Sequence, residues 1–392
     1  MLEVIATGCF HSALPDGRSA FAAVRSAKAK GAVVVDAGDF FSGSAFHTFS
    51  QGRVEERLLS ELYDAVVPGN HDLPDLMRLR DPDRFPPVVC ANLRPPPAFA
   101  GRWVSGLMLE RGAHRLGVVG YLGRQAFETI PAHERADFTY CDPTAELIGA
   151  EAARLREAGA DIVIGVSHTG FLADVADQET GWPLPVVVAS HCHSPWSHWT
   201  ETGRHVAKPP AAGTGLLRMV LSPSGSHRVT QETCPPSASS GDGLEADLEA
   251  YEAWGQELLG TLEAPLADRR DVARRLADHA RRILGAQTFV LNLYTLRSGL
   301  PQTVTRRDLM ACAPFDSDLV VLDAPCPLDV LTARSHAVGE ELLTATSDSA
   351  QGPSPVVTTG YVADRLGLPA HPVHPPRTLR DTLTDLVRSP HE

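Results

Sequence analysis

The segment AVVVDAGDFF (residues 32–41) is an apolar, β-branched run that ends at two aspartates. A short run of this kind beside glycine is typical of a buried strand, and Asp36 and Asp39 stand at its carboxyl end. In layered α/β domains, functional groups collect at the carboxyl ends of the strands. The residues that follow each apolar run are therefore the first place to search for a site.

Similar runs recur along the first half of the chain, separated by segments with helical spacing. Residues 19–30, 54–63 and 144–158 carry apolar side chains at helical intervals. Six further runs are predicted strands: 2–6, 64–68, 87–91, 115–121, 161–167 and 185–190. This alternation predicts an α/β domain built of sheet and helix layers.

Polar side chains with metal-binding chemistry follow five of these runs. They are Cys9 and His11; Asp36 and Asp39; Asn70, His71 and Asp72; His168; and His191 with His193. Imidazole, carboxylate, amide and thiolate groups all ligate metals. A lone histidine at a strand end is more often a packing or capping residue. Five strand ends with this chemistry in one domain indicate a functional cluster.

The composition is that of an ordinary globular protein. Its 392 residues are 43% hydrophobic and 21% charged, enough for two domains. No segment approaches ~20 uninterrupted apolar residues, and the start MLEVIATG lacks the features of a signal peptide. We therefore expect a cytoplasmic protein with no membrane partner.

Charge and cysteine content narrow the partners further. The formal net charge of −13, with no basic run, argues against a nucleic-acid polymer as partner but allows a small anion at a local cation site. The seven cysteines are scattered and form no CxxC pair, so neither a disulfide framework nor a structural zinc finger is predicted. The oligomeric state is left open.

The sequence changes character near residue 222. SPSGSHRVTQETCPPSASSGDG is rich in serine, proline and glycine, and residues 244–284 then read as one long helical stretch. Strand-like runs resume at 288–294 and 318–324. We predict a catalytic domain over residues 1–225, a linker and connecting helix over 226–285, and a smaller α+β domain over 286–392.

Several of these motifs resemble the calcineurin-like metallophosphoesterases, in particular their 5′-nucleotidase branch. GDFFSGS, VPGNHD, SHTG and SHCH stand in the order that this branch shows, and TVTRRDL (303–309) and APFDSDLVVLD (313–323) are similar to its C-terminal substrate-binding domain. The resemblance implies a four-layer αββα domain with two metal ions, which clamp the attacking and leaving oxygens and activate water near neutral pH.

The resemblance also implies roles for single residues. Asp39 would bridge both metals. The first metal would take His11, His193 and the residue at position 9, and the second would take Asn70, His168 and His191. His71 would act on the substrate, with Asp72 fixing its tautomer and orientation. The alternative is that His71 and Asp72 only cap the start of a helix.

Position 9 departs from the family pattern. The family carries an aspartate there, in a D-x-H pair, and this chain has Cys9-Phe10-His11. A thiolate has the charge of the lost carboxylate, and it favours iron or zinc over magnesium; manganese, zinc or iron suits the second position. The alternative is that Cys9 is a buried thiol beside a weakened first site.

The C-terminal segment departs further. NLYTLR retains Asn292 and Arg297 of the family's substrate-binding motif but lacks its glycines. The leading hypothesis is a phosphomonoester hydrolase for a nucleotide or another small phosphorylated metabolite. Cleavage of a cyclic phosphodiester or of a thiosulfate-type sulfur bond is a variant of it, and a non-catalytic ligand-binding relative is the alternative.

Overall fold

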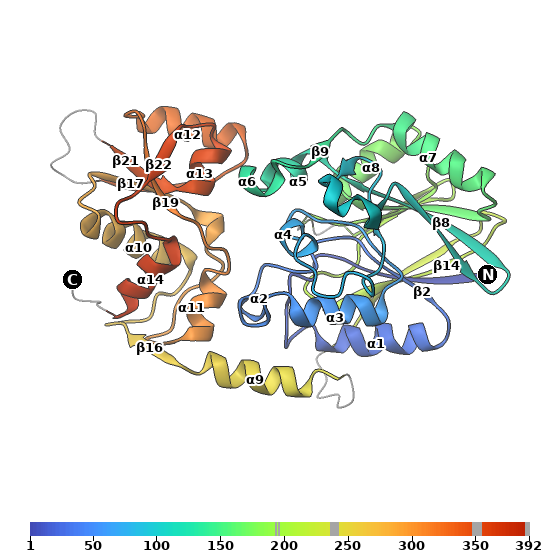
Figure 1. Ribbon diagram of the computed structural model, residues 1–392, viewed down its shortest axis with the longest axis horizontal. Coiled ribbons are helices and arrows are strands. Elements are labelled where there is room, and N and C mark those ends of the chain that lie inside the picture. The colour runs from blue at the N-terminus through green and yellow to red at the C-terminus, as the bar shows by residue number, and fades with distance from the viewer. Residues whose placement is uncertain (193, 195–196, 236–242, 347–354, 389–392) are drawn as a thin grey trace. The chain divides into compact units, whose positions relative to one another are not determined.

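The computed structural model describes residues 1–192, 194, 197–235, 243–346 and 355–388 (Figure 1). The chain divides into two units, Met1–Leu248 and Glu249–Glu392. Among the described residues, no helix is both long enough and apolar enough to cross a bilayer.

The first unit contains two large sheets. Within the described residues, the first sheet has seven strands in the order β15 (Arg228–Thr233), β14 (Gly215–Leu221), β1 (Leu2–Thr7), β2 (Val33–Asp36), β3 (Ala65–Val66), β4 (Val88–Val89) and β6 (Trp103–Val104). The second has six, in the order β12 (His198–Glu201), β13 (Arg204–Ala207), β11 (Val186–Ala189), β10 (Ile162–His168), β8 (His114–Leu122) and β7 (Gly106–Arg111).

The two sheets pack face to face over an apolar core. Val4 and Val35 of the first sheet and Val118 and Ile164 of the second belong to one buried cluster. Intervening residues such as Val34 are also fully buried, because both faces of the central strands are covered. The pairs β1–β2, β2–β3, β10–β8 and β10–β11 are parallel, so within each sheet the carboxyl ends of these strands lie at one edge.

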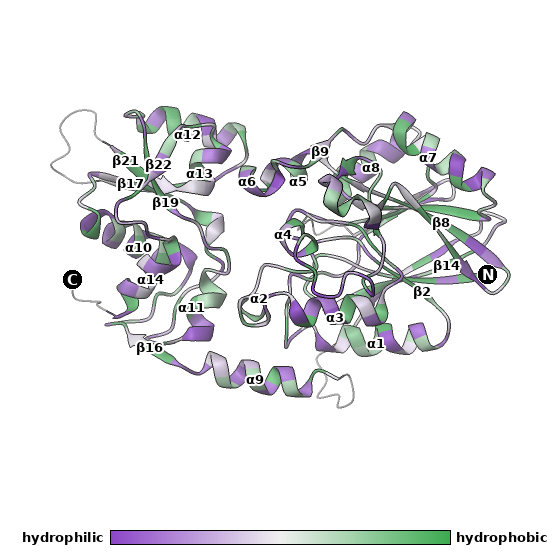
Figure 2. Ribbon diagram, viewed as in Figure 1, coloured by the Kyte–Doolittle hydropathy of each residue, from purple (hydrophilic) through white to green (hydrophobic). Residues whose placement is uncertain are grey.

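Helices cover the outer faces of the sandwich. α1 (Arg18–Ala29) and α3 (Arg53–Leu62) lie along the first sheet, and α7 (Ala145–Glu157) and α8 (Phe171–Glu179) lie along the second (Figure 1). Figure 2 shows hydrophilic and hydrophobic bands alternating along these helices, as expected where one side meets the sheet. This arrangement confirms the predicted four-layer αββα fold.

Shorter elements connect these layers. They are α2 (Ala45–Ser50), α4 (Leu73–Leu76), α5 (Arg124–Thr129), α6 (Ala132–Arg135), the 3₁₀ helix η1 (Pro97–Arg102), and the paired strands β5 (Leu93–Arg94) and β9 (Thr139–Tyr140). A longer helix, α9 (Glu245–Gly255), runs across the boundary between the two units.

The second unit is built on a mixed sheet. Its described strands have the order β20 (Leu342–Thr346), β17 (Thr288–Asn292), β21 (Val356–Thr359), β19 (Leu319–Leu322) and β22 (Ala370–Pro372). A first apolar cluster joins the sheet to α10 (Arg269–Ile283), α11 (Arg306–Cys312) and α14 (Leu379–Arg388), and a second joins it to α12 (Leu328–Ala337) and α13 (Gly360–Arg365). A two-stranded ribbon, β16 (Leu258–Thr261) with β18 (Thr303–Thr305), and the 3₁₀ helix η2 (Leu293–Thr295) complete it.

The region predicted as linker and single helix differs in the structure. β15 pairs along its length with β14 and so extends the first sheet. The expected helix over 244–284 is two helices, α9 and α10, with β16 between them. Asp268 begins α10 by accepting hydrogen bonds from the amides of Arg270 and Asp271, and the apolar side of α10 packs inside the second unit. These residues are therefore parts of the two units rather than a separate connector.

Candidate metal centre

The ends of five strands supply the side chains of the candidate site. Cys9 and His11 follow β1, Asp39 follows β2, and Asn70 follows β3; β10 ends at His168, and His191 follows β11. The structure brings these six side chains together. His193 lies outside the described residues, so its predicted place as a ligand stays a prediction.

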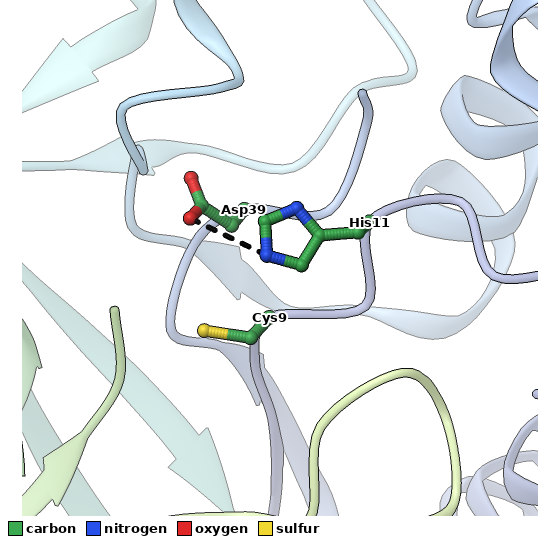
Figure 3. Close-up of side chains that lie close together, drawn as sticks. All are labelled: Cys9, His11 and Asp39. Carbon is green, nitrogen blue, oxygen red and sulfur yellow. Dashed lines mark ion pairs between the residues drawn. The ribbon is translucent and has the colours of Figure 1, made fainter. Parts of the chain in front are cut away.

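One group of possible ligands consists of Cys9, His11 and Asp39. One ligand atom from each lies within 4.8 Å of the others, and Figure 3 shows the three side chains converging on a common space. The Nε2 atom of His11 is 3.7 Å from Oδ2 of Asp39. A thiol, an imidazole and a carboxylate at this spacing suit a thiophilic ion such as zinc or iron.

A second group consists of Asp39, His168 and His191, whose ligand atoms also lie within 4.8 Å of one another. Asn70 belongs with this group, because its Oδ1 is 3.2 Å from Nε2 of His168 and 2.9 Å from Nδ1 of His191. Nitrogen and oxygen donors without sulfur suit manganese, zinc or iron.

Asp39 is common to both groups, and its two oxygens have different surroundings. Oδ1 accepts a hydrogen bond of 2.9 Å from the backbone amide of His71. Oδ2 is 3.1 Å from Nε2 of His168 and also faces His11. This 2% exposed carboxylate is therefore fixed through one oxygen and presents the other to both groups.

Backbone carbonyls set the tautomers of two of the histidines. Nδ1 of His11 lies 3.0 Å from the carbonyl oxygen of Ser42, and Nδ1 of His168 lies 2.7 Å from that of Ala37. Because a carbonyl only accepts, Nδ1 carries the proton in both rings, and a neutral ring then presents the lone pair of Nε2. Such contacts are typical of metal-binding histidines.

The convergence of acceptor atoms fits a cation. The Nε2 lone pair of His168, Oδ2 of Asp39 and Oδ1 of Asn70 face one another at hydrogen-bond distance, which is stable only if a proton or a metal ion lies among them. Burial opposes a charge on His168, but the Asp39 carboxylate outweighs it and raises the pKa of His168. Burial likewise opposes ionisation of Asp39, yet His168 and His71 hold the pKa of that carboxyl well below its usual range.

The Cys9 sulfur is enclosed by polar groups. Sγ lies 3.1 Å from Oγ of Ser190 and accepts a hydrogen bond of 3.2 Å from the amide of His191. Burial, with a further contribution from Asp39, raises the pKa of the Cys9 thiol to about 12. Cys9 is therefore protonated at neutral pH unless a metal ion displaces its proton, as metals do on binding to thiols.

The backbone is strained at the same place. Among the described residues, eight non-glycine residues have a positive φ, and five of them belong to the site loops: Cys9 (48°), His11 (53°), Ser12 (54°), Asp39 (58°) and His191 (79°). This conformation costs about 1–3 kcal/mol for such residues and concentrates at functional sites. Four of these five residues are predicted ligands. The backbone strain is therefore a second indication of a functional site, separate from the chemistry of the side chains.

The carboxylate of Asp72 has other partners than the predicted one. Its carboxylate does not orient the His71 ring but accepts hydrogen bonds from four backbone amides, those of Asp39, Phe40, Phe41 and Gly69, at 2.7–3.0 Å. It also makes no side-chain cap on α4. Asp72 is fully buried, and burial raises its pKa to about 6, with Asp39 adding to the shift. It is a positioning residue that ties the loop after β2 to the loop after β3.

Two glycines allow these loops to meet. A Cβ on Gly38 would lie 2.6 Å from Nδ1 of His168, and one on Gly69 would lie 2.2 Å from the amide nitrogen of Asp39. Gly38 also has a φ of +90°. The glycines of the GD and GN motifs therefore supply close approach beside the ligands.

The His71 ring lies beside the first group of possible ligands. It makes an edge contact with the ring of His11, with 5.2 Å between centroids, and is half-buried. This position beside the first ligand group is the one expected for a residue that meets substrate, and its catalytic role stays a prediction.

Two polar residues that the sequence did not single out also shape the site. Ser190 contacts the Cys9 sulfur, and Lys208 donates hydrogen bonds to the carbonyls of Cys192 (3.0 Å) and Ser194 (2.6 Å). Lys208 thus holds the loop that carries His191. Its only signal in the sequence is its place just after β13.

In the second unit, Asn292 is held by protein contacts, and substrate binding by Asn292 stays a prediction. It is 2% exposed, its amide donates to Oε2 of Glu340 at 2.5 Å, and its oxygen accepts from the amide of Tyr294 at 2.8 Å. It caps η2. Arg297 is exposed and lies over the ring of Phe315, 5.2 Å from its centroid, so substrate binding by Arg297 stays a prediction.

A four-layer αββα domain in which two groups of metal-binding side chains share one carboxylate is typical of metal-dependent phosphoesterases. Residues 2–195 match the sequence model of the family described as calcineurin-like phosphoesterase. The N-terminal part of the chain therefore carries a calcineurin-like phosphoesterase domain.

The relatives with similar sequences include 5′-nucleotidases. The snake venom 5′-nucleotidase of Crotalus adamanteus is 26% identical over 259 residues, which cover 63% of this chain and 39% of that protein. This chain therefore spans about two fifths of that relative's length.

Two solved structures share the fold across both units. A 5′-nucleotidase precursor of Thermus thermophilus superposes with a TM-score of 0.77 at 17% identity, covering 99% of this chain and 96% of that one. A sulfate thiohydrolase of Thermus thermophilus superposes with a TM-score of 0.70 at 17% identity, covering 95% of this chain and 80% of that one.

Proposed function

We propose that the protein is a metal-dependent phosphomonoester hydrolase that acts on a nucleotide or another small phosphorylated metabolite. The observation that carries the proposal is the position of Asp39, whose Oδ2 faces both groups of possible ligands. A shared carboxylate sets two ions at the short separation that phosphoryl transfer requires. The family match and the 5′-nucleotidase relatives support the same reaction class.

The proposed ligand sets follow the two groups. Cys9, His11 and Asp39, with His193, would hold the first ion, for which we favour iron or zinc. Asp39, Asn70, His168 and His191 would hold the second, for which manganese, zinc or iron is suitable. Bound there, the two ions would polarise the phosphoryl oxygens and lower the pKa of a bound water.

The side chains of the chain itself would position the reaction. Asn70 contributes a neutral oxygen where a carboxylate would add a second negative charge, which keeps the site attractive to phosphate. Protonated His71, which is half-buried beside His11, would stabilise developing charge or donate a proton to the leaving oxygen. In the second unit, the planar guanidinium of Arg297 suits a phosphate or carboxylate of the substrate.

The direct test is a substrate panel with the purified protein loaded with zinc, iron or manganese. Nucleoside 5′-monophosphates, sugar phosphates, a cyclic nucleotide, an aryl phosphodiester and a thiosulfate ester would be compared. Monoester cleavage is followed by release of phosphate, cleavage of the cyclic nucleotide by formation of the nucleoside monophosphate, cleavage of the aryl diester by release of the phenol, and cleavage of the sulfur substrate by release of sulfate. We expect phosphate release from monoesters, abolished by a chelator. Turnover of only the diester or the sulfur substrate would replace the proposal by its variant, which the fold likeness to the sulfate thiohydrolase supports. No turnover with any metal would favour a ligand-binding protein.

Replacing His71 with asparagine should lower kcat by roughly 10²–10⁴-fold, the usual contribution of a general acid or base. Metal content should stay the same, because the predicted ligands remain and the backbone amide of residue 71 still donates to Asp39. The exposed His133 provides the matched control, since its only described ion-pair partner is Glu134. Equal kcat values for His71→Asn and His133→Asn would remove His71 from the mechanism.

Replacing Cys9 with aspartate tests the unusual ligand. An oxygen donor is harder than a thiolate, so we expect activity with zinc or iron to fall and the preference to move toward manganese or magnesium. Elemental analysis and activity with each metal would measure the change. If the wild-type protein is inactive with every metal and the Cys9→Asp variant is active, Cys9 stands at a ligand position without binding a metal ion.

A further inference from the structure

Three histidines outside the metal centre gather at the edge of the sandwich. His198 lies in β12, His205 in β13, and His227 just before β15. In the β12–β13 pair, Thr200 is opposite His205 and His198 is opposite Ala207. Because side chains alternate along a strand, His198 and His205 therefore lie on one face of this hairpin, at a diagonal spacing that long side chains can bridge.

The three rings stand close to one another, with His205 in the middle. The ring centroids of His198 and His205 are 5.8 Å apart with nearly parallel planes (18°), and those of His205 and His227 are 6.4 Å apart. For comparison, His168 and His191 in the metal centre are 5.1 Å apart. The two spacings exceed that of the His168–His191 pair by 0.7 Å (5.8 − 5.1) and 1.3 Å (6.4 − 5.1), so the rings would have to turn toward one another to share an ion.

The chemistry of the rings suits metal binding. Nδ1 of His205 is buried and has no hydrogen-bond partner among the described residues, so its lone pair or proton is left unsatisfied. The amide of Ser222 approaches Nδ1 of His227 at 3.5 Å, the outer limit of a hydrogen bond, and so fixes that ring only weakly.

Electrostatics favours the ligand form of all three rings. Burial lowers the pKa of His198 and of His227, and it lowers that of His205 together with the two neighbouring rings. The three imidazoles are therefore neutral at pH 7, which is the form that binds metals.

We propose that His198, His205 and His227 form a further site for one divalent transition metal ion that prefers imidazole, such as zinc, nickel or copper. All three side chains would bind the ion through imidazole nitrogen, a donor that magnesium and manganese do not prefer. The ion would link the edge of the second sheet to the edge of the first, where Ser197 already donates to Oε1 of Gln231 at 3.0 Å. This inference does not rest on the proposed hydrolase activity.

The test is zinc stoichiometry after equilibrium dialysis at pH 7.5, measured by elemental mass spectrometry. We expect wild-type protein to hold one zinc ion more per chain than either His205→Asn or His198→Asn. His198 is exposed, so its replacement leaves the packing intact if His205→Asn should fail to fold. Zinc should also raise the midpoint of thermal unfolding further in wild type than in the variants, since an ion that binds only the folded state stabilises it.

The exposed His133 is again the matched control. His133→Asn should keep the wild-type stoichiometry. The same stoichiometry in wild type, His198→Asn and His205→Asn would overturn the proposal, and so would an equal loss in His133→Asn, which would show unspecific binding to exposed imidazoles.

Discussion

Replacing Asp39 with asparagine is expected to remove both metal ions and to lower kcat/KM by roughly 10³-fold or more. Oδ2 of Asp39 faces His11 and His168 from two different ligand groups, so the loss of its charge weakens both at once. Metal ions supply several kcal/mol of transition-state stabilisation, and each 1.4 kcal/mol corresponds to about tenfold in rate. Elemental analysis and steady-state kinetics on the purified variant would measure both effects.

Asp36 offers a control three residues away. It is also fully buried, but its partners are the hydroxyl of Thr7 (2.5 Å) and the amide of Gly38 (2.9 Å). Burial raises its pKa to about 7, so an asparagine there changes the charge only in part. Asp36→Asn should keep both ions. If Asp39→Asn also kept both, the shared-carboxylate account would be wrong.

Replacing Asp72 with alanine is expected to cost about 4 kcal/mol or more of unfolding free energy in the first unit. Four buried amides lose their acceptor together, and each unsatisfied donor costs about 1–3 kcal/mol before relaxation. For a domain of this size, such a loss corresponds to a fall of roughly 10 °C in Tm. Metal affinity should fall as well, because the loop after β2 carries Asp39.

Asp16 provides the comparison for stability. It is exposed in the same unit, and Asp16→Ala should change the unfolding free energy by no more than about 0.5 kcal/mol. Thermal unfolding of metal-free protein separates this effect from metal binding. A Tm for Asp72→Ala within about 2 °C of the Asp16→Ala value would mean that the loops hold together without the carboxylate.

The sequence predicts the location of the site because functional side chains follow the carboxyl ends of strands, and the strands can be recognised from their apolar runs. Parallel strands in the two packed sheets place the residues after β1, β2, β3, β10 and β11 at neighbouring edges. Cys9, Asp39, Asn70 and His168 converge as a result. Because hydrophobic runs define the strands, the polar residues that follow each strand can be identified without knowledge of any contact in the fold.

The role of Asp72 could not be found in this way. Its carboxylate binds amides of residues 39–41, about thirty positions earlier, and that contact depends on how two loops turn in space. In sequence, Asp72 adjoins His71 and so suggests a pair with it. The same limit applies to Asn292, whose partner Glu340 comes from a distant loop.

The error over residues 244–284 has a different cause. Alanine, leucine and arginine dominate the segment, and helical propensity suggested one helix. The interruptions were present as Gly255, Gly260 and Pro265, followed by Asp268 as an N-cap. Glycine and proline interrupt helices even where the average helical propensity is high. These residues therefore predict two helices, α9 and α10, in place of one.

The central claim is that Cys9 is a metal ligand in a dinuclear centre, and X-ray absorption at the zinc K edge tests it most directly. In zinc-loaded wild-type protein we predict a sulfur scatterer at about 2.3 Å, together with nitrogen and oxygen at about 2.0–2.1 Å. The sulfur contribution should disappear in Cys9→Ser, which leaves the other six cysteines in place. Nitrogen and oxygen scatterers alone in the wild type, or a sulfur signal unchanged in Cys9→Ser, would contradict the account.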